Sequence, residues 1–173
     1  MDDVRGAFTA ALCSIVGMPC DLLLATNSIR LRFDFRSSPK GRAYIWIDPP
    51  WRLMADGTLR AGSNDYPVRD GAEDQEVYQS LLAAWCAHFD GLDGAPLAEA
   101  CLGRDYPDLC LRFESGHQLE TFSHGGPDCW WYYKDCATGQ VFEAGAWGIR
   151  HQLDRPADAE PGAAADGGRD ASF

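Results

Sequence analysis

The hydrophobic residues at the start of the chain first follow a helical period and then a strand period. Four apolar residues recur at helical spacing and predict an amphipathic helix over residues 3–16: Val4, Phe8, Leu12 and Ile15. Gly17 and Pro19 supply the stop signal for this helix. From residue 28 onward apolar and polar residues alternate, as in a strand with one buried face. A turn cluster at 37–41 then predicts an antiparallel return strand at about 42–48.

The same order of patterns recurs in the rest of the chain. Asp56-Gly57 lies between two short apolar runs and predicts a tight hairpin, because glycine accepts the positive φ of a primed turn. An acidic loop over 62–76 leads into a second amphipathic helix, whose core stripe consists of Val77, Leu81, Leu82, Trp85 and Phe89. A further hairpin is predicted at 109–122, followed by two strands around Thr138-Gly139.

Short sequences recur between the two halves. Leu31-Arg32-Phe33 is echoed by Leu111-Arg112-Phe113, and Gly17-Met18-Pro19 by Gly94-Ala95-Pro96. Trp51-Arg52-Leu53 before Asp56-Gly57 corresponds to Trp130-Trp131-Tyr132 before Thr138-Gly139. We therefore predict an α+β fold built from two divergent copies of a helix plus antiparallel-strand unit, with internal pseudo-symmetry.

The copies define the predicted domain limits. Repeat 1 covers about residues 3–67 and repeat 2 about 71–148, within one domain over 1–151. Residues 152–173 have no apolar period and are rich in Asp, Ala, Gly and Pro, which predicts a disordered acidic tail. The sheets of the two units either join or pack together.

The net charge of −11 and the pI near 4.6 restrict the partners of this chain. Such a surface repels nucleic acid, because affinity for phosphates comes from Lys and Arg. Acidity serves solubility, or it complements a basic partner by electrostatic steering.

The seven cysteines are odd in number and form no Cys-x-x-Cys, which favours a reducing cytoplasm. The N-terminal Met-Asp-Asp lacks the basic region of a signal peptide, and no apolar run is long enough for a membrane span.

Catalytic and metal-binding motifs are not apparent in the sequence. His117, His124, Cys129 and Cys136 lie near one another, but their gaps are wider and less regular than those of zinc sites. Cys86 and His88 point apart on a helix, so a core cysteine is the better interpretation. The sequence has no phosphate loop, nucleophile elbow or His-Glu-x-x-His. We predict no catalytic residues, no metal and no cofactor.

The run Trp130-Trp131-Tyr132-Tyr133 places bulky rings on both faces of one strand. If the sheet is covered on one side only, two of these rings are exposed and resemble the anchors of a protein interface. If the sheet is buried on both sides, all four belong to the core.

Two segments carry a resemblance to a family. Ile47-Asp48-Pro49-Pro50-Trp51-Arg52-Leu53, continuing to Tyr66-Pro67, and the later Leu111-Arg112-Phe113 with Leu119-Glu120-Thr121-Phe122 resemble small bacterial proteins, some of which are neighbours of toxin genes. The likeness covers about residues 12–148. It implies an immunity protein of bacterial polymorphic or interbacterial toxin systems, which is a cytoplasmic toxin inhibitor that binds one cognate toxin domain.

The resemblance carries no set of functional residues across, so the site residues are hypotheses from chemistry. Toxins such as nucleases and deaminases present basic clefts, which an acidic inhibitor would occlude. Toxin binding is assigned to Asp65, Asp70, Glu73 and Asp74 for steering, with Trp131 and Tyr133 as anchors. The alternatives are a small-ligand-binding or enzymatic domain with a site between the two repeats, and an adaptor for another bacterial partner.

Overall fold

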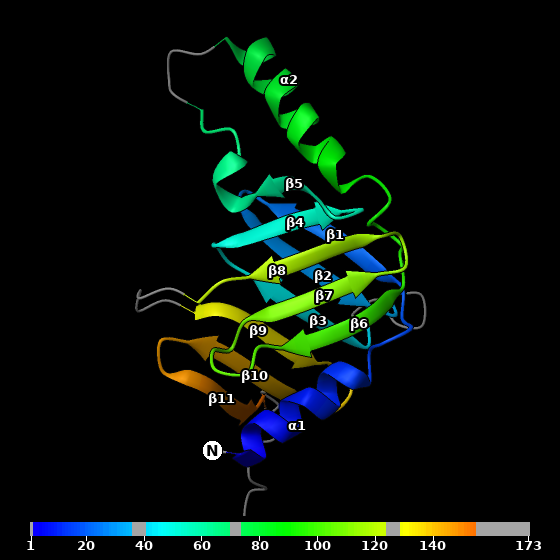
Figure 1. Cartoon of the computed structure of the whole chain (residues 1–173), viewed down its shortest axis with the longest axis vertical. Helices are drawn as coiled ribbons and strands as arrows, with labels where there is room; N and C mark the ends of the chain where they lie inside the picture. Colours follow the sequence, from blue (N-terminus) through cyan, green and yellow to red (C-terminus); the bar gives the residue numbers. More distant parts are fainter. Residues whose placement is uncertain (1, 36–40, 70–73, 124–128, 155–173) are drawn as a thin grey trace, which may run out of the picture.

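The computed structural model describes residues 2–35, 41–69, 74–123 and 129–154. Within them the chain forms two antiparallel sheets and two α-helices, so the predicted α+β class is confirmed. The sheets lie one behind the other, with a helix at each end of the molecule (Figure 1).

The larger sheet has six strands in the order β1-β2-β3-β9-β10-β11. Their bounds are β1 Cys20–Ala25, β2 Ser28–Phe33, β3 Ala43–Ile47, β9 Cys129–Asp135, β10 Gln140–Gly145 and β11 Gly148–Leu153. The predicted hairpin over 28–48 is confirmed, because Leu31 pairs with Ile45 across β2 and β3.

The smaller sheet has five strands in the order β5-β4-β8-β7-β6. Their bounds are β4 Trp51–Ala55, β5 Thr58–Gly62, β6 Leu97–Leu102, β7 Leu109–Phe113 and β8 His117–Thr121. The predicted Asp56-Gly57 turn joins β4 to β5, and both residues have positive φ, 50° and 74°. The hairpin predicted at 109–122 is also present, as β7 and β8.

Each sheet combines strands from both halves of the chain. β3 pairs with β9, and β4 pairs with β8, so the two halves are joined inside both sheets. A bridge between Pro19 and Pro96 connects the loops before β1 and β6. Strands of the two halves therefore join within each sheet, and the two sheets also pack against each other.

The core lies between the sheets and takes alternate residues of β2, β3, β4, β7 and β8. Ile29, Leu31 and Phe33 of β2 are fully buried, and Leu111 of β7 shares their cluster. The polar residues between them point outward, as period-two alternation requires. Side chains on the two outer faces are therefore not required to be apolar by the packing of the core.

The helices cover the ends of this core through aromatic contacts. Phe8 of α1 (Asp2–Cys13) stacks on Trp131 with ring centroids 4.6 Å apart. The ring centroid of Trp85 in α2 (Gln75–Cys86) lies 6.3 Å from that of Trp51. The ring centroid of Phe89 in the short helix η2 (Ala87–Phe89) lies 5.9 Å from that of Trp51. α1 ends three residues before the predicted position.

The strand β11 was not predicted. It pairs with β10 along its whole length, and the first two residues of the predicted tail, Gln152 and Leu153, belong to it. Residues 155–173 lie outside the described residues.

Candidate protein-binding face

The outward side chains of the six-stranded sheet form two neighbouring rows. The upper row, defined by cross-strand register, contains Arg30, Trp46, Tyr132 and Glu143. The next row contains Arg32, Tyr44, Lys134 and Val141. We call these eight residues the aromatic face. α1 contacts the inward side chains of this sheet, where Phe8 stacks on Trp131, and α2 stands at the opposite end of the molecule (Figure 1).

Three rings at the centre of the aromatic face contact one another. Tyr44 meets Tyr132 edge to face at 5.6 Å between centroids, and Trp46 lies nearly parallel to Tyr132 at 6.5 Å. All three side chains are half-buried. Their mutual packing restricts their rotamers, so a partner would meet a surface that is already ordered.

The Trp46 ring is also held by hydrogen bonds from the end of its strand. Its Nε1 donates to Asp48 Oδ1 at 2.8 Å, and the Ser28 hydroxyl donates to the same oxygen at 2.6 Å. Because Asp48 follows β3 directly, one carboxylate links the ends of β2 and β3 to the indole. The donor of Trp46 is therefore satisfied inside the molecule, and its flat surface is the part left for a partner.

Tyr132 stays a neutral phenol across physiological pH. Burial raises its pKa to about 12, and the hydrogen bond with Tyr44 adds to the shift. A neutral phenol is a less costly group to desolvate than a phenolate, which suits a ring that becomes buried in an interface.

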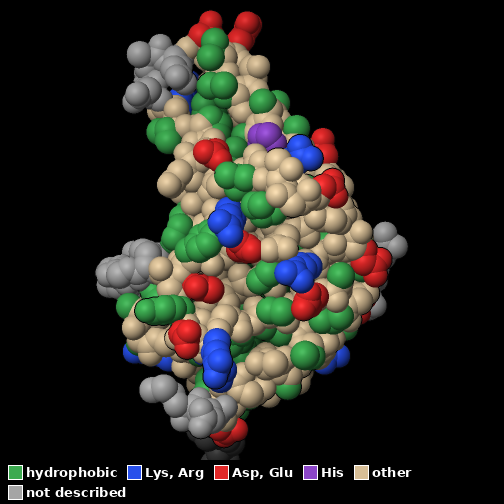
Figure 2. Space-filling model, in the orientation of Figure 1, with side chains coloured by type: hydrophobic (Ala, Val, Ile, Leu, Met, Phe, Trp, Pro, Cys, Tyr) green, Lys and Arg blue, Asp and Glu red, His purple; other side chains and the backbone are tan. Residues whose placement is uncertain are grey.

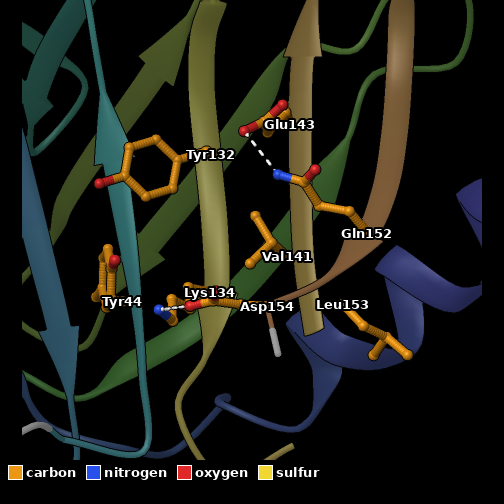
Figure 3. A pocket seen from close by; sticks show the side chains of 8 residues that line it. All are labelled: Tyr44, Tyr132, Lys134, Val141, Glu143, Gln152, Leu153 and Asp154. Atoms are coloured by element: carbon orange, nitrogen blue, oxygen red, sulfur yellow. Dashed lines mark hydrogen bonds and ion pairs between the residues drawn. The ribbon is translucent and has the colours of Figure 1, made fainter. Parts of the chain in front are cut away.

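An open pocket of about 300 Å³ adjoins the rings between β3, β9, β10 and β11 (Figure 3). Two side-chain pairs border it: Lys134 binds Asp154, and Gln152 Nε2 donates to Glu143 Oε1 at 3.2 Å. The hydrogen bond to Asp154 raises the pKa of Lys134, so the ammonium stays charged. Polar walls around an open hollow suit a polar group of a partner better than an enclosed apolar ligand.

Arg30 is the cation of this face that lacks a described ionic partner. None of the ion pairs or side-chain hydrogen bonds among the described residues includes it, and its Nε is screened from solvent without an acceptor. Its neighbour in the next row, Arg32, binds Asp21 at 2.6 Å. A carboxylate or carbonyl from a partner would satisfy the Arg30 guanidinium.

Two of the four acidic residues predicted for steering, Asp65 and Asp74, lie at the end of the molecule where α2 stands. Asp65 closes the short helix η1 (Ser63–Asp65), where its carboxylate accepts a hydrogen bond from Gly62 N at 2.7 Å. Asp74 caps α2 by accepting from Glu76 N at 3.0 Å. Both side chains are exposed, and Asp70 and Glu73 lie outside the described residues.

The predicted anchors Trp131 and Tyr133 are fully buried, so the expectation that they reach a partner at the surface is corrected. Trp131 Nε1 donates to Pro107 O at 2.6 Å, and the Tyr133 hydroxyl donates to Ala11 O at 3.4 Å. The reason is register: β3 pairing turns Trp131 and Tyr133 inward and leaves Tyr132 outward.

Sequence reasoning did not single out Tyr44 and Trp46. The signal was present in Ala43-Tyr44-Ile45-Trp46-Ile47, where aromatic residues alternate with small and aliphatic ones. Aliphatic residues fill the core side of such a strand, so the rings occupy the other side.

Three observations concern the groups that metal binding or nucleophilic catalysis would use. They contain no group of three His, Cys, Asp or Glu side chains that could hold a metal ion. Burial raises the pKa of the Cys20 thiol to about 12, which suppresses the thiolate. Ser115 Oγ lies 3.0 Å from His117 Nδ1 within a hairpin turn, but in the described part of the chain no hydrogen bond or ion pair links a carboxylate to this ring.

Comparison with protein-family models, curated proteins and solved structures found no match to this chain. Across the described ranges, no helix is both long and apolar enough to cross a membrane.

Proposed function

We propose that this chain is an immunity protein, which binds a toxin domain in the bacterial cytoplasm and occludes its active site. The observation that carries the proposal is the aromatic face, where three ordered rings and Arg30 lie together on the outer side of a sheet. Trp, Tyr and Arg are the residues most enriched at the energetic centres of protein interfaces. A rigid sheet that presents them binds with little loss of conformational entropy.

The net charge supports the same proposal from a different direction. A protein of charge −11 accelerates its encounter with a basic surface, such as the cleft of a toxin that acts on nucleic acid. We retain Asp65, Asp70, Glu73 and Asp74 as steering residues. The separation of Asp65 and Asp74 from the aromatic face fits this division, because steering acts over about one Debye length rather than by contact.

We also infer that the fold arose from two divergent copies of one unit. Exchange of β1-β2-β3 with β6-β7-β8, and of β9-β10 with β4-β5, converts the first five strands of the larger sheet into the order of the smaller one, and β11 has no counterpart. Trp51 and Trp131 then correspond, since each is buried and donates Nε1 to a backbone carbonyl, that of Asn27 and Pro107 respectively. On this inference Trp51 matches Trp131 rather than Trp130.

The proposed function is tested by co-expression with the product of the adjacent gene. A stable complex that co-elutes and protects the host cell is the expected result. Trp46→Ala should weaken both co-elution and protection, whereas Arg112→Ala, an exposed change on the five-stranded sheet, should leave them intact. Absence of both binding and protection for the unmodified chain would overturn the proposal.

A small polar ligand in the pocket is the second candidate, because the pocket spans the β3–β9 boundary where the two halves meet. Stabilisation by a polar metabolite, measured as a rise in Tm that Lys134→Ala removes, would favour this alternative. No such rise across a metabolite panel would leave the immunity function as the proposal.

A further inference from the structure

The two helices stand at opposite ends of the sandwich and differ in how well they are covered. α1 packs against β6 of one sheet and β11 of the other. α2 is held at its C-terminal end, where Trp85 and Phe89 meet Trp51, and by a hydrogen bond of 3.2 Å between the Tyr78 and Tyr66 hydroxyls, and it projects beyond β5 (Figure 1). Towards its N-terminus, Val77 and Leu81 form one helical stripe that is 52% and 48% exposed.

The sheet edges beside the two helices also differ, because one is paired with a further strand and the other is not. β10 follows β9 and has its far side paired with β11 over six residues. β5 follows β4, and in the described part of the chain it ends its sheet. Thr58, Leu59 and Arg60 of β5 are exposed, Leu59 by 59%. An unpaired edge of this kind is a template for another strand.

The sequence around this end of the molecule is acidic. Residues 58–76 contain five Asp or Glu but only two basic residues, Arg60 and Arg69. α2 itself has no Lys or Arg. Figure 2 shows hydrophobic side chains along α2 with acidic ones at its tip. A segment that lies here is therefore favoured if it is basic, and a second copy of this acidic end is disfavoured.

We propose that the far edge of β5 and the Val77–Leu81 stripe of α2 receive an extended basic segment of the partner protein, as a sixth strand of the smaller sheet. This segment would lie beside β5 as β11 lies beside β10. Backbone hydrogen bonds to β5 would supply affinity, and apolar side chains on alternate positions, all on the side of α2, would cover the stripe. The proposal rests on the proposed function, since it assumes a protein partner.

The first test uses a capped six-residue peptide of alternating valine and lysine with the full chain. The expected result is slower amide hydrogen exchange in β5, by about tenfold at saturation. The matched control is the same peptide with alternate backbone nitrogens methylated, which should give no protection. Equal protection by both peptides, or protection at β1, β6 or β11 instead of β5, would overturn the proposal. So would protection that grows with the concentration of the chain alone, because the edge would then bind a second copy.

The second test uses the double variant Val77→Gln, Leu81→Gln, which removes the apolar stripe without adding charge and whose exposed positions leave the core intact. Peptide protection of β5 should fall to the level of the methylated control, while Trp46→Ala should leave it unchanged. With the adjacent gene product as partner, the double variant should weaken complex formation at least tenfold. An unchanged complex would overturn this inference and leave the proposed function standing, whereas a wild-type chain that binds no such partner would overturn the proposed function instead.

Discussion

The outer faces of the two sheets obey the same alternation but present opposite chemistry. On the five-stranded sheet, polar side chains satisfy one another: Arg52 Nε donates to Glu120 at 2.5 Å, and Arg112 binds both Glu99 at 2.8 Å and Gln118 at 2.9 Å. Figure 2 shows basic and acidic side chains interspersed across it. The six-stranded sheet presents Tyr44, Trp46 and Tyr132 instead. A face that closes its own hydrogen bonds gains little from a partner, whereas half-buried rings still have apolar area to bury.

The largest expected effect is on the free energy of unfolding, and it distinguishes inward residues from those on the outer faces. Trp131→Ala should lower the free energy of unfolding by about 3–5 kcal/mol, because it opens a cavity beneath α1 and removes the stacking on Phe8. Trp46→Ala, on the same sheet but outward, should cost less than about 1.5 kcal/mol. Urea unfolding of both variants measures the difference. Equal losses would show that the aromatic face serves stability as the core does.

The affinity for the partner should depend on residues of one outer face and not on those of the other. Trp46→Ala should raise the Kd for the cognate partner by about 30-fold, corresponding to about 2 kcal/mol at an interface centre. Arg112→Ala, on the other face, should change it less than about twofold. Calorimetric titration of the two variants gives the comparison directly, and a reversed order would move the interface to the five-stranded sheet.

The pH dependence should reveal the packing of the aromatic face. The pKa of Tyr132 is raised from 10.0 to about 12, so its contribution to stability is complete below pH 10 and is lost as the pH rises towards 12. Tyr44→Phe removes the hydrogen bond and should lower the pKa of Tyr132. Ultraviolet absorbance titration of tyrosinate measures this, with Tyr132→Phe identifying the transition because burial also raises the pKa of Tyr133 to about 12. An unchanged pKa in Tyr44→Phe would mean that burial alone sets it.

The smallest effect is expected for the ion pairs of the five-stranded sheet. Arg52→Ala should lower the free energy of unfolding by no more than about 1 kcal/mol, because the partly exposed pair with Glu120 is screened by solvent. Added salt should reduce the difference from the unmodified chain. A loss above about 2 kcal/mol would show that this network also holds the sheet together.

Local patterns predicted where the hairpins and helices lie, because each depends on residues close in sequence. The core stripe predicted for the second helix was wrong at Val77 and Leu81, which are exposed. The Asp56-Gly57 turn and the β2–β3 pair are of this kind. Which side of β9 faces inward could not be read locally, since Trp131 and Tyr132 are both bulky and aromatic. That choice depends on the register with β3 and on Phe8 from the first helix, which are distant in sequence.

The sequence did not predict which strands of the two halves pair with each other. It also did not predict β11. Alternation identifies a strand but not its neighbours, and the β3–β9 pair has no local signal. Tyr44 was consequently assigned no role, because its value to a binding face arises only when Tyr132 is brought beside it.

The pairing of β3 with β9 also governs how the chain acquires its fold. A nascent chain that has extended only as far as β8 holds one sheet that ends at β3, with the backbone groups of that strand awaiting β9. Contacts of such high sequence separation form slowly, and an unpaired strand edge is prone to join another molecule meanwhile. The protein thus completes its larger sheet only after synthesis of β9, and translation speed through the segment before Cys129 sets how long the exposed edge persists.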